Sequence, residues 1–297
     1  MQKTWSTPVV SEEKQPVPCM LCGSMLFKPS LLCEGFSYVQ CTGCGLVQMN
    51  PQPLEEEIIR RYSESSGKDY FSYQLQNEKA FLALQLLALA DVDFDGLEKG
   101  VLENNGQSNK EEPARVLDLG CATGSLLAEL KKRGWETVGI EIGDLQADYG
   151  KYKKNLDIRS LPLEENNFPA SYFNVVLASH LIEHLNNPFS FLREVCRILK
   201  DGGHLFITTP NISGFQARLY RGKWRSAIFD HLYLFSKFTL KNLLKKTGFK
   251  AERTRTWGGL AQGFSIPVIK KYADKTAKFL NIGDVMIVRA VKVSGVL

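Results

Sequence analysis

The sequence predicts an α/β fold, a doubly wound parallel sheet with a small zinc-binding unit near the N-terminus. Two observations lead to this prediction. From Arg115 onward, short apolar runs alternate with amphipathic stretches of about ten to fifteen residues, a pattern typical of strands and crossover helices. Before that, four cysteines occur as two C-x2-C pairs separated by eighteen residues, a spacing typical of zinc sites.

Length and composition narrow the class of protein. The 297 residues are 44% hydrophobic and 23% charged, which excludes a wholly disordered chain and predicts about two domains. The longest near-continuous apolar stretch, residues 80–90, falls well short of the roughly 20 residues that cross a bilayer. The N-terminal residues lack the apolar segment of a signal peptide. We therefore expect a cytoplasmic protein without a transmembrane segment.

The zinc unit is expected over residues 19–53, after a flexible lead-in over residues 1–18 that contains three prolines. A glycine follows each C-x2-C pair and permits the tight turn that such a pair needs. Four thiolates leave no open position on Zn²⁺, so the ion is expected to be structural. Disulfides or reduced core cysteines are the alternatives, and Cys33 either packs or replaces a ligand. The expected metal ligands are Cys19, Cys22, Cys41 and Cys44.

Residues 54–112 are expected to contain helices and a linker. Residues 54–62 have the pattern of a short amphipathic helix, and residues 75–91 carry apolar side chains at helical spacing. Residues 99–113 are polar and contain glycine and proline, so they predict a loop.

The sheet domain is expected over residues 113–297. Its predicted strands cover residues 115–121, 137–142, 156–158, 173–179, 202–210 and 285–293. Its predicted helices cover residues 125–135, 144–154, 188–200 and 239–249.

A glycine-containing loop follows the first of these strands. It reads D-L-G-C-A-T-G over residues 118–124, and its glycines permit close approach of a ligand to the backbone. The spacing differs from the G-x-G-x-x-G of dinucleotide sites. Glu141 ends the next strand, where a carboxylate can accept hydrogen bonds from ribose hydroxyls. Because parallel sheets bind ligands at the carboxyl ends of their strands, we expect a nucleoside-containing ligand here.

These motifs resemble those of the class I S-adenosylmethionine-dependent methyltransferases. V-L-D-L-G-C-A-T-G is similar to the first family motif, D-I-R-S-L-P to the third-strand segment and F-N-V-V to the fourth strand. The resemblance implies a Rossmann-like seven-stranded sheet with one reversed strand near the end. It also implies that Glu141 binds ribose, Asp157 the adenine amino group and the Ile158 amide the ring. The expected cofactor-binding residues are Asp118, Gly120, Cys121, Gly124, Glu141, Ile142, Asp157, Ile158 and Ser179.

A narrower resemblance covers the order of the parts. A zinc unit ending in C-G-L-V and N-P-x-P, this domain, and then D-H-L-Y-L-F-S are similar to bacterial methyltransferases of sugar and secondary-metabolite pathways. This implies methyl transfer to a small molecule such as a sugar, a nucleotide-sugar or a surface-polysaccharide precursor. Tyr70, Phe71 and Tyr73 occupy a segment that forms a lid over the cofactor in related enzymes. An aromatic cluster that joins the two domains is the alternative.

The segment S-H-L-I-E-H, residues 179–184, follows the fourth strand, where the resemblance places the reacting methyl group. His180 is the first candidate for a general base, because an imidazole titrates near neutral pH. A hydrogen-bonded histidine that orients the loop is the alternative. His231 is the second candidate base.

Three nearby residues are assigned to the acceptor pocket or the core. His184 and Tyr233 are expected to bind substrate, although Tyr233 can equally be a core residue, and Glu183 is expected to shape the pocket. H-x-x-E-H is also an inverted zinc-protease motif. We reject that interpretation because the segment follows a buried strand and no third, distant ligand is indicated. His204 is expected to be structural.

The charge of +5 is unevenly distributed. Residues 211–257 contain eleven Lys and Arg and two acidic residues, which suits a phosphate-bearing substrate, an anionic surface or a solvated helix. An RNA methyltransferase that binds RNA through its zinc unit is a rival interpretation. Residues 19–53 contain a single cation, Lys28, which disfavours a nucleic-acid partner. A non-catalytic S-adenosylmethionine-binding protein is the third interpretation, and the sequence predicts no oligomeric state.

Overall fold

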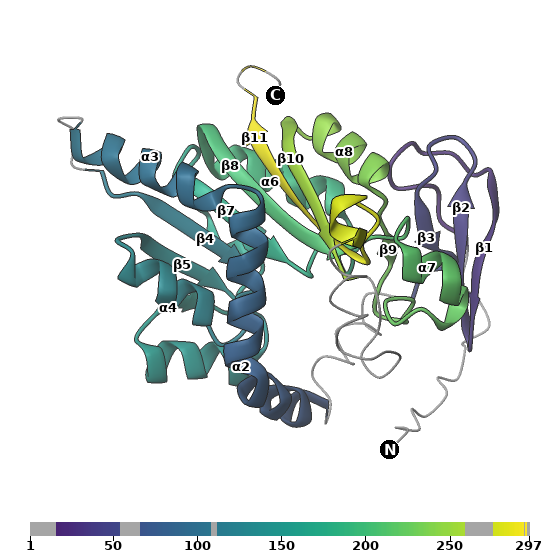
Figure 1. Ribbon diagram of the computed structural model, residues 1–297, viewed down its shortest axis with the longest axis horizontal. Coiled ribbons are helices and arrows are strands. Elements are labelled where there is room, and N and C mark those ends of the chain that lie inside the picture. The colour runs from purple at the N-terminus through teal and green to yellow at the C-terminus, as the bar shows by residue number, and fades with distance from the viewer. Residues whose placement is uncertain (1–15, 54–65, 108–111, 259–275, 294, 296–297) are drawn as a thin grey trace.

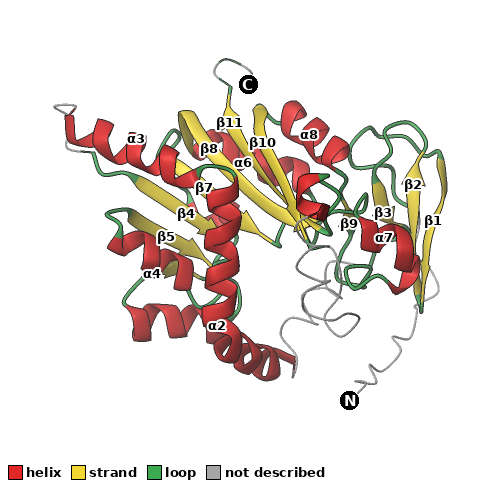
Figure 2. Ribbon diagram, viewed as in Figure 1, coloured by secondary structure: helices red, strands yellow, loops and turns green. Residues whose placement is uncertain are grey.

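Two sheets form the framework of the molecule. The computed structural model describes residues 16–53, 66–107, 112–258, 276–293 and 295. Within these residues one sheet has seven strands and the other has four. Figure 1 shows the larger sheet across the middle of the molecule and the smaller sheet at its right-hand side. Helices cover both faces of the larger sheet (Figure 2), so the predicted α/β class is confirmed.

The larger sheet has the predicted seven strands. They are β4 (Arg115–Leu119), β5 (Glu136–Ile140), β6 (Asp157–Arg159), β7 (Phe173–Ser179), β8 (Leu199–Pro210), β10 (Phe249–Trp257) and β11 (Val285–Lys292). Their order across the sheet is β10-β11-β8-β7-β4-β5-β6. β11 is antiparallel to both of its neighbours, whereas β8, β7, β4, β5 and β6 pair in parallel. The single reversed strand near the end is therefore confirmed.

One strand, β10, was missed by the sequence analysis. Its segment F-K-A-E-R-T-R-T-W contains four charged residues, and all of them are exposed. β10 lies at the edge of the sheet, where charged side chains are common because they discourage pairing with another chain. They also hide the apolar pattern by which an inner strand is recognised.

The helices follow the strands in the predicted alternation. They are α2 (Ser66–Asp91), α3 (Phe94–Gln107), α4 (Ser125–Lys132), α5 (Asp144–Asp148), the π-helix η1 (Tyr149–Lys153), the 3₁₀-helix η2 (Leu163–Asn166), α6 (Pro188–Ile198), α7 (Phe215–Tyr220), the 3₁₀-helix η3 (Arg221–Lys223) and α8 (Lys237–Lys246). Local chemistry sets several of their ends. Asn187 accepts a hydrogen bond from the amide of Ser190 at the start of α6. Ser236 and Thr239 form a capping box at the start of α8.

The loop predicted over residues 99–113 is wrong for its first part, because α3 continues to Gln107. Phe94 and Leu97 near the start of this helix are buried against the larger sheet. The helix is therefore anchored by these residues, and Val101 and Leu102 pack against the same cluster. The helix predicted over residues 54–62 lies outside the described residues, as does the lead-in before residue 16.

The smaller sheet joins the zinc unit to the second half of the chain. Its strands are β1 (Phe27–Cys33), β2 (Phe36–Cys41), β3 (Val47–Met49) and β9 (Tyr233–Leu234), in that order. β9 pairs with β3, and the hydroxyl of Tyr38 donates to the carbonyl of His231 at 2.7 Å. The zinc unit and the segment that precedes α8 therefore fold together.

The apolar core is continuous across this junction. Leu21 and Leu46 of the zinc unit belong to the same buried cluster as Ile182, Leu232 and Phe235. Within the described residues, no helix is both long and apolar enough to cross a membrane.

Candidate functional site

The loop between β4 and α4 has the conformation that its glycines allow. Gly120 and Gly124 both have φ of +73°, and Ala122 between them has φ of +49°. The amides of Gly120 and Cys121 both donate to the carbonyl of Ile140 at 2.9 and 3.0 Å. A left-handed conformation costs a residue such as Ala122 roughly 1–2 kcal/mol, and such strain is concentrated at functional sites.

Glu141 closes this loop from the end of β5. Its Oε2 accepts a hydrogen bond from the amide of Ala122 at 2.9 Å, and its Oε1 accepts one from the amide of Gly143 at 2.8 Å. Burial raises the pKa of Glu141, and the two amides partly offset the rise. Asp118, at the buried end of β4, has its pKa raised to about 7, first by burial and then by the charge of Glu141. Two carboxyl groups therefore meet at this position.

Strand register brings the other predicted cofactor residues to the same edge. Leu119 pairs with Ile140 on one side and with Ala178 on the other. The loops and strand ends that follow therefore lie together. Of the predicted cofactor residues near them, Asp157 and Ile142 are exposed, Ile158 and Cys121 are buried, and Ser179 is half-buried.

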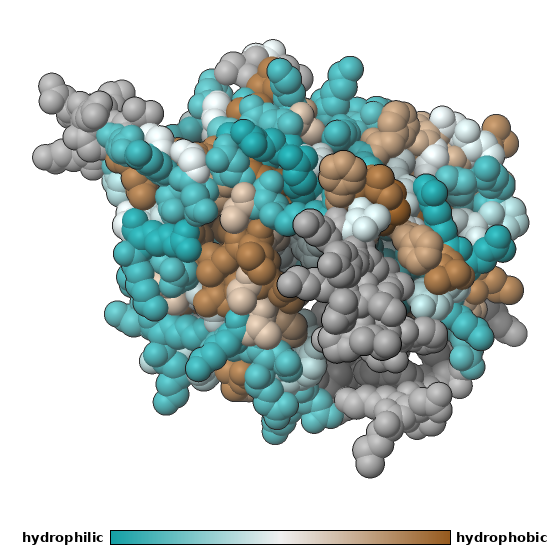
Figure 3. Space-filling model, in the orientation of Figure 1, coloured by the Kyte–Doolittle hydropathy of each residue, from teal (hydrophilic) through white to brown (hydrophobic). Residues whose placement is uncertain are grey.

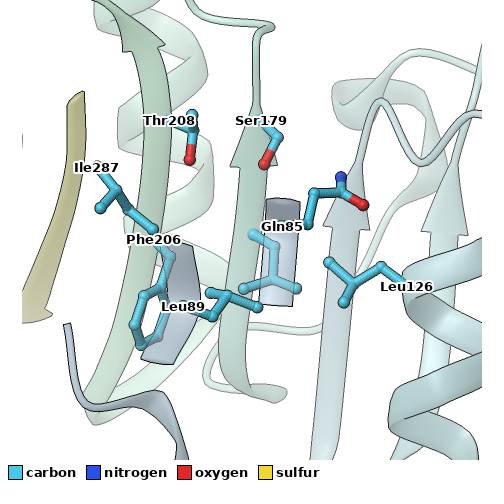
Figure 4. A pocket seen from close by; sticks show the side chains of 8 residues that line it. Gln85, Leu89, Leu126, Ser179, Phe206, Thr208 and Ile287 are labelled. Atoms are coloured by element: carbon cyan, nitrogen blue, oxygen red, sulfur yellow. The ribbon is translucent and has the colours of Figure 1, made fainter. Parts of the chain in front are cut away.

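α2 lies over the ends of these strands. Figure 4 shows a small cavity to which α2 contributes Gln85 and Leu89, and β7 and β8 contribute the hydroxyls of Ser179 and Thr208. Leu126, Leu177, Phe206 and Ile287 complete its lining. This cavity therefore lies between α2 on one side and the sheet on the other.

A polar contact that the sequence analysis missed holds α2 to the glycine loop. Glu78 accepts hydrogen bonds from the hydroxyl of Thr123 at 2.6 Å and from the ammonium of Lys154 at 2.5 Å. Lys154 also donates to the hydroxyl of Ser125. Glu78 and Lys154 are far apart in the sequence, and neither belongs to a motif, so no sequence pattern indicated the contact.

The aromatic residues of the predicted lid form the first turns of α2. Phe71 packs edge-to-face on Tyr149 of η1 at 5.8 Å. Burial raises the pKa of Tyr70, and the charge of Glu141 contributes to the rise. Further along α2, the apolar side chains of Phe81, Leu84 and Leu87 are exposed. Figure 3 shows a hydrophobic area on this face of the molecule, where Figure 1 places α2. The start of α2 therefore faces the cofactor side of the sheet.

His180 begins the loop after β7 in a strained conformation. It has φ of +53°, and its amide donates to the carbonyl of Thr208 at 2.8 Å. Its side chain is 51% exposed, and its Nδ1 lies 3.4 Å from Oε1 of the fully buried Glu183. Burial by itself raises the pKa of Glu183. The neighbouring His180, His184 and His231 outweigh this effect and lower it to about 2. The buried carboxylate is therefore surrounded by imidazoles.

His231 lies deeper than His180. It is 7% exposed, and burial, followed by the charge of His184, lowers its pKa to about 4. The ring centroids of His184 and His231 are 4.6 Å apart. Tyr233 is buried in β9, and its hydroxyl donates to the carbonyl of Asn186 at 3.1 Å. The structure thus gathers all four predicted catalytic and substrate residues around the loop after β7, with His180 the most accessible of them.

The four predicted metal ligands converge in the zinc unit. Their sulfur atoms all lie within 4.8 Å of one another. The sulfurs of Cys19 and Cys44 are 3.4 Å apart, and those of Cys22 and Cys41 are 3.5 Å apart. These distances exceed the ~2.05 Å of a disulfide and approach the ~3.8 Å that separates sulfurs around one zinc ion.

Two matched turns create this arrangement. The amide of Gly23 donates to the carbonyl of Cys19 at 2.7 Å, and that of Gly45 donates to the carbonyl of Cys41 at 2.9 Å. Both glycines have positive φ, as the tight turn requires. Among the described residues, Cys33 is not part of the group. The four thiols therefore fit a tetrahedral zinc ion.

Comparison with known proteins places this architecture in a family. A family model described as a methyltransferase domain matches residues 94–254, which is more than half of the chain. The chain belongs to this methyltransferase family. The predicted class of S-adenosylmethionine-dependent methyltransferases is thereby confirmed.

The relatives of this methyltransferase include curated enzymes. A ubiquinone biosynthesis O-methyltransferase of Acinetobacter baumannii is 31% identical over 104 residues, which cover 33% of this chain and 44% of that protein. The mitochondrial ubiquinone biosynthesis O-methyltransferase of Rattus norvegicus is 36% identical over 180 residues, which cover 52% of each chain. The methyltransferase described here thus spans about half the length, or less, of these curated relatives.

Solved structures also resemble it. One from Thermotoga maritima, described as an S-adenosylmethionine-dependent methyltransferase and possible histamine N-methyltransferase, is 18% identical, with a TM-score of 0.49 and coverage of 75% of this chain and 98% of that chain. Another such methyltransferase, from Archaeoglobus fulgidus, is 20% identical, with a TM-score of 0.47 and coverage of 70% and 99%.

Proposed function

We propose that this chain transfers the methyl group of S-adenosylmethionine to a small-molecule acceptor at the carboxyl ends of β4 to β7. The observation that carries the proposal is the closure of the glycine loop by Glu141, at the end of the neighbouring strand. A carboxylate whose oxygens already accept hydrogen bonds from two amides is fixed in the position from which it can accept others from ribose hydroxyls.

The residues around this carboxylate suit the rest of the cofactor. Asp157 is exposed at the rim, where it can accept a hydrogen bond from an adenine amino group. Ser179 ends β7 beneath α2, on the side where acceptor and cofactor would meet. When bound, the sulfonium cofactor supplies an electrophilic methyl group. The residues of the chain position the acceptor, exclude water and remove its proton.

His180 is the proposed base, and its exposure supports this choice over His231. A base must reach the acceptor, and the His180 side chain is half exposed while His231 is almost fully buried. The backbone strain at His180 is a second argument, because the loop holds this residue at a positive φ that residues other than glycine rarely adopt, and such strain is concentrated at functional sites.

The proposed acceptor is a small molecule that is methylated on a hydroxyl group. The O-methyltransferase relatives support hydroxyl chemistry. The acceptors that we propose, a sugar, a nucleotide-sugar or a related precursor, all carry several hydroxyl groups that could be methylated. Burial lowers the pKa of Lys237, and the charges of Lys241 and Arg218 lower it further. The excess of Lys and Arg over residues 211–257, which includes these three cations, favours a phosphate-bearing acceptor.

We also propose that the four-cysteine group holds one structural zinc ion and that residues 19–53 act as a zinc ribbon fused to the catalytic domain. The surface of this unit gives no support to the rival RNA methyltransferase. Met25, Leu26 and Leu32 are exposed large hydrophobic side chains of this unit, and Lys28 is its only cation. RNA binding requires several cations facing phosphates. The proposed location of the protein is cytoplasmic.

Calorimetry with S-adenosylhomocysteine tests the cofactor site. We expect wild-type protein to bind and Glu141→Ala to bind about 10- to 100-fold more weakly, because hydrogen bonds to a charged group contribute about 1.5–3 kcal/mol. Glu136→Ala, at the other end of β5, is the matched control and should bind normally. Equal affinities for wild type and Glu141→Ala would refute the proposed site. Labelled methyl donor with fractionated cell extract would then identify the acceptor by mass analysis.

A further inference from the structure

Three potential metal ligands from two distant segments meet beside the proposed base. Glu183 and His184 lie in the loop after β7, whereas His231 precedes β9. Each offers one ligand atom, and these atoms all lie within 4.8 Å of one another. The zinc-protease interpretation of H-x-x-E-H was rejected partly because the sequence indicated no third, distant ligand. In the structure His231 occupies that position, and Glu183 and His184 supply the other two.

Backbone carbonyls orient both imidazoles in the same way. Nδ1 of His231 lies 2.8 Å from the carbonyl oxygen of Ser226, and Nδ1 of His184 lies 2.9 Å from that of Asp230. A carbonyl oxygen only accepts hydrogen bonds, so each Nδ1 carries the proton. The neutral imidazole then presents Nε2 as a lone-pair donor. Histidines that bind metal ions are commonly fixed in this manner.

The carboxylate of Glu183 is incompletely satisfied. It is fully buried, and its Oε2 accepts a hydrogen bond from the hydroxyl of Thr209 at 2.9 Å. Its Oε1 has no hydrogen-bond partner of good geometry within the described part of the chain, although Nδ1 of the half-exposed His180 lies 3.4 Å away. A buried carboxylate oxygen without a partner is costly, and a cation beside it would remove that cost. The oxygen has two lone pairs, so it can ligate an ion and still face His180.

We propose that Glu183, His184 and His231 bind a divalent first-row transition-metal ion, a second metal site besides the four-cysteine group. Two imidazoles and one carboxylate favour Zn²⁺, Co²⁺ or Fe²⁺ over Mg²⁺ and Ca²⁺, which prefer oxygen ligands. Three protein ligands leave coordination positions open. The ion connects the loop that carries His180 to the segment before β9, the strand that pairs with β3. This site stands independently of the proposed methyl transfer.

Cobalt titration of the full-length protein tests the site, because the two ligand sets differ in spectrum. Co²⁺ held by thiolates gives intense sulfur-to-metal charge transfer, whereas Co²⁺ held by nitrogen and oxygen gives only weak d–d bands. For wild type we expect two bound equivalents, one with each signature. His231→Gln and Glu183→Gln should each weaken the weak-band equivalent at least about tenfold and retain the thiolate equivalent.

His204→Gln is the control, since this imidazole faces Glu252 and Arg289 in another part of the sheet. It should bind both equivalents. Calorimetry with S-adenosylhomocysteine checks that each variant is folded, and it also keeps failure of the metal site distinct from failure of the cofactor site. A single, thiolate-type equivalent in wild type would overturn the proposal. A second equivalent that persists unchanged in both folded variants would also overturn it.

Discussion

The two sheets of this molecule are stabilised in different ways. The inner strand β4 is buried along almost its whole length, as expected for a parallel strand with helices on both faces. β1 of the smaller sheet is mostly exposed; Leu32 within it is 85% exposed, and Leu26 just before it is 71% exposed. The larger sheet is held by apolar burial. The smaller one buries Tyr38 and Met49 against Trp224 and β9, which come from the other half of the chain, and its four cysteines lie together at one end.

The comparison teaches where sequence patterns suffice. A strand buried on both faces is a continuous apolar run, so its position follows from local sequence. The smaller sheet buries its apolar side chains mainly against residues that are distant in the chain, so local sequence does not show how it is completed.

The largest expected effect separates the two sheets directly. Cys41→Ser should remove zinc from the four-cysteine group and with it a large part of the ~10–16 kcal/mol that a structural zinc contributes to folding. Hydrogen exchange should then show loss of amide protection in β1, β2 and β3, while β4 and β7 stay protected. Cys33→Ser, in the same unit but outside the group, is the control. Unchanged protection of β1 to β3 in Cys41→Ser would show that the smaller sheet is stable without metal.

The next effect concerns the loop after β7, where the carbonyl of Glu183 accepts hydrogen bonds from the amides of Leu232 and Tyr233 beside the smaller sheet. His180→Gln should reduce kcat roughly 10²- to 10⁴-fold, the usual contribution of a general base. Its affinity for S-adenosylhomocysteine should stay at the wild-type value, because His180 lies on the acceptor side. His204→Gln should leave both quantities unchanged. Wild-type turnover by His180→Gln would assign proton removal to another group.

A third test measures how strongly the larger sheet buries charge. The folded pKa of Asp118 is raised from 3.8 to about 7 by burial and by Glu141. Between these pH values the folded state keeps a proton that the unfolded state has lost, so wild-type stability should fall as pH rises through this window.

Asp118→Asn lacks this titration. We would measure the free energy of unfolding in urea at about pH 4 and about pH 8. Relative to the wild type, the free energy of unfolding of the variant should be higher at pH 8 than at pH 4 by an amount on the order of 2–4 kcal/mol. An identical pH dependence for both proteins would mean that Asp118 is ionised in the fold at neutral pH.

The smallest expected effect tests the ion pair between Glu78 of α2 and Lys154 beside the glycine loop. The Glu78–Lys154 pair is partly exposed, at 26% and 18%, so Lys154→Met should cost no more than about 1 kcal/mol. We therefore expect the affinity for S-adenosylhomocysteine to fall by no more than about fivefold, measured by calorimetry. Lys153→Met, an exposed neighbour, should bind normally. A much larger loss would show that α2 holds the cofactor itself.

The sequence by itself determined the larger sheet, the glycine loop with Glu141 and the four cysteines. Each of these depends on short-range patterns such as apolar runs, glycines at turns and paired cysteines. Glu141 follows directly from a strand boundary, so the alternation of strands and helices was enough to place it beside the loop. The edge strand β10 was not predicted, because its charged residues interrupt the apolar run by which a strand is recognised.

Only the tertiary structure decided which distant residues meet. It paired β9 with β3, brought Glu78 to Lys154 and placed His231 beside Glu183 and His184. None of these contacts follows from local spacing, because each joins residues that are far apart in the sequence and meet only when the chain folds. They form because the zinc unit packs on the segment before α8 and α2 packs on the strand ends, and both arrangements are set by burial of apolar surface over the whole molecule.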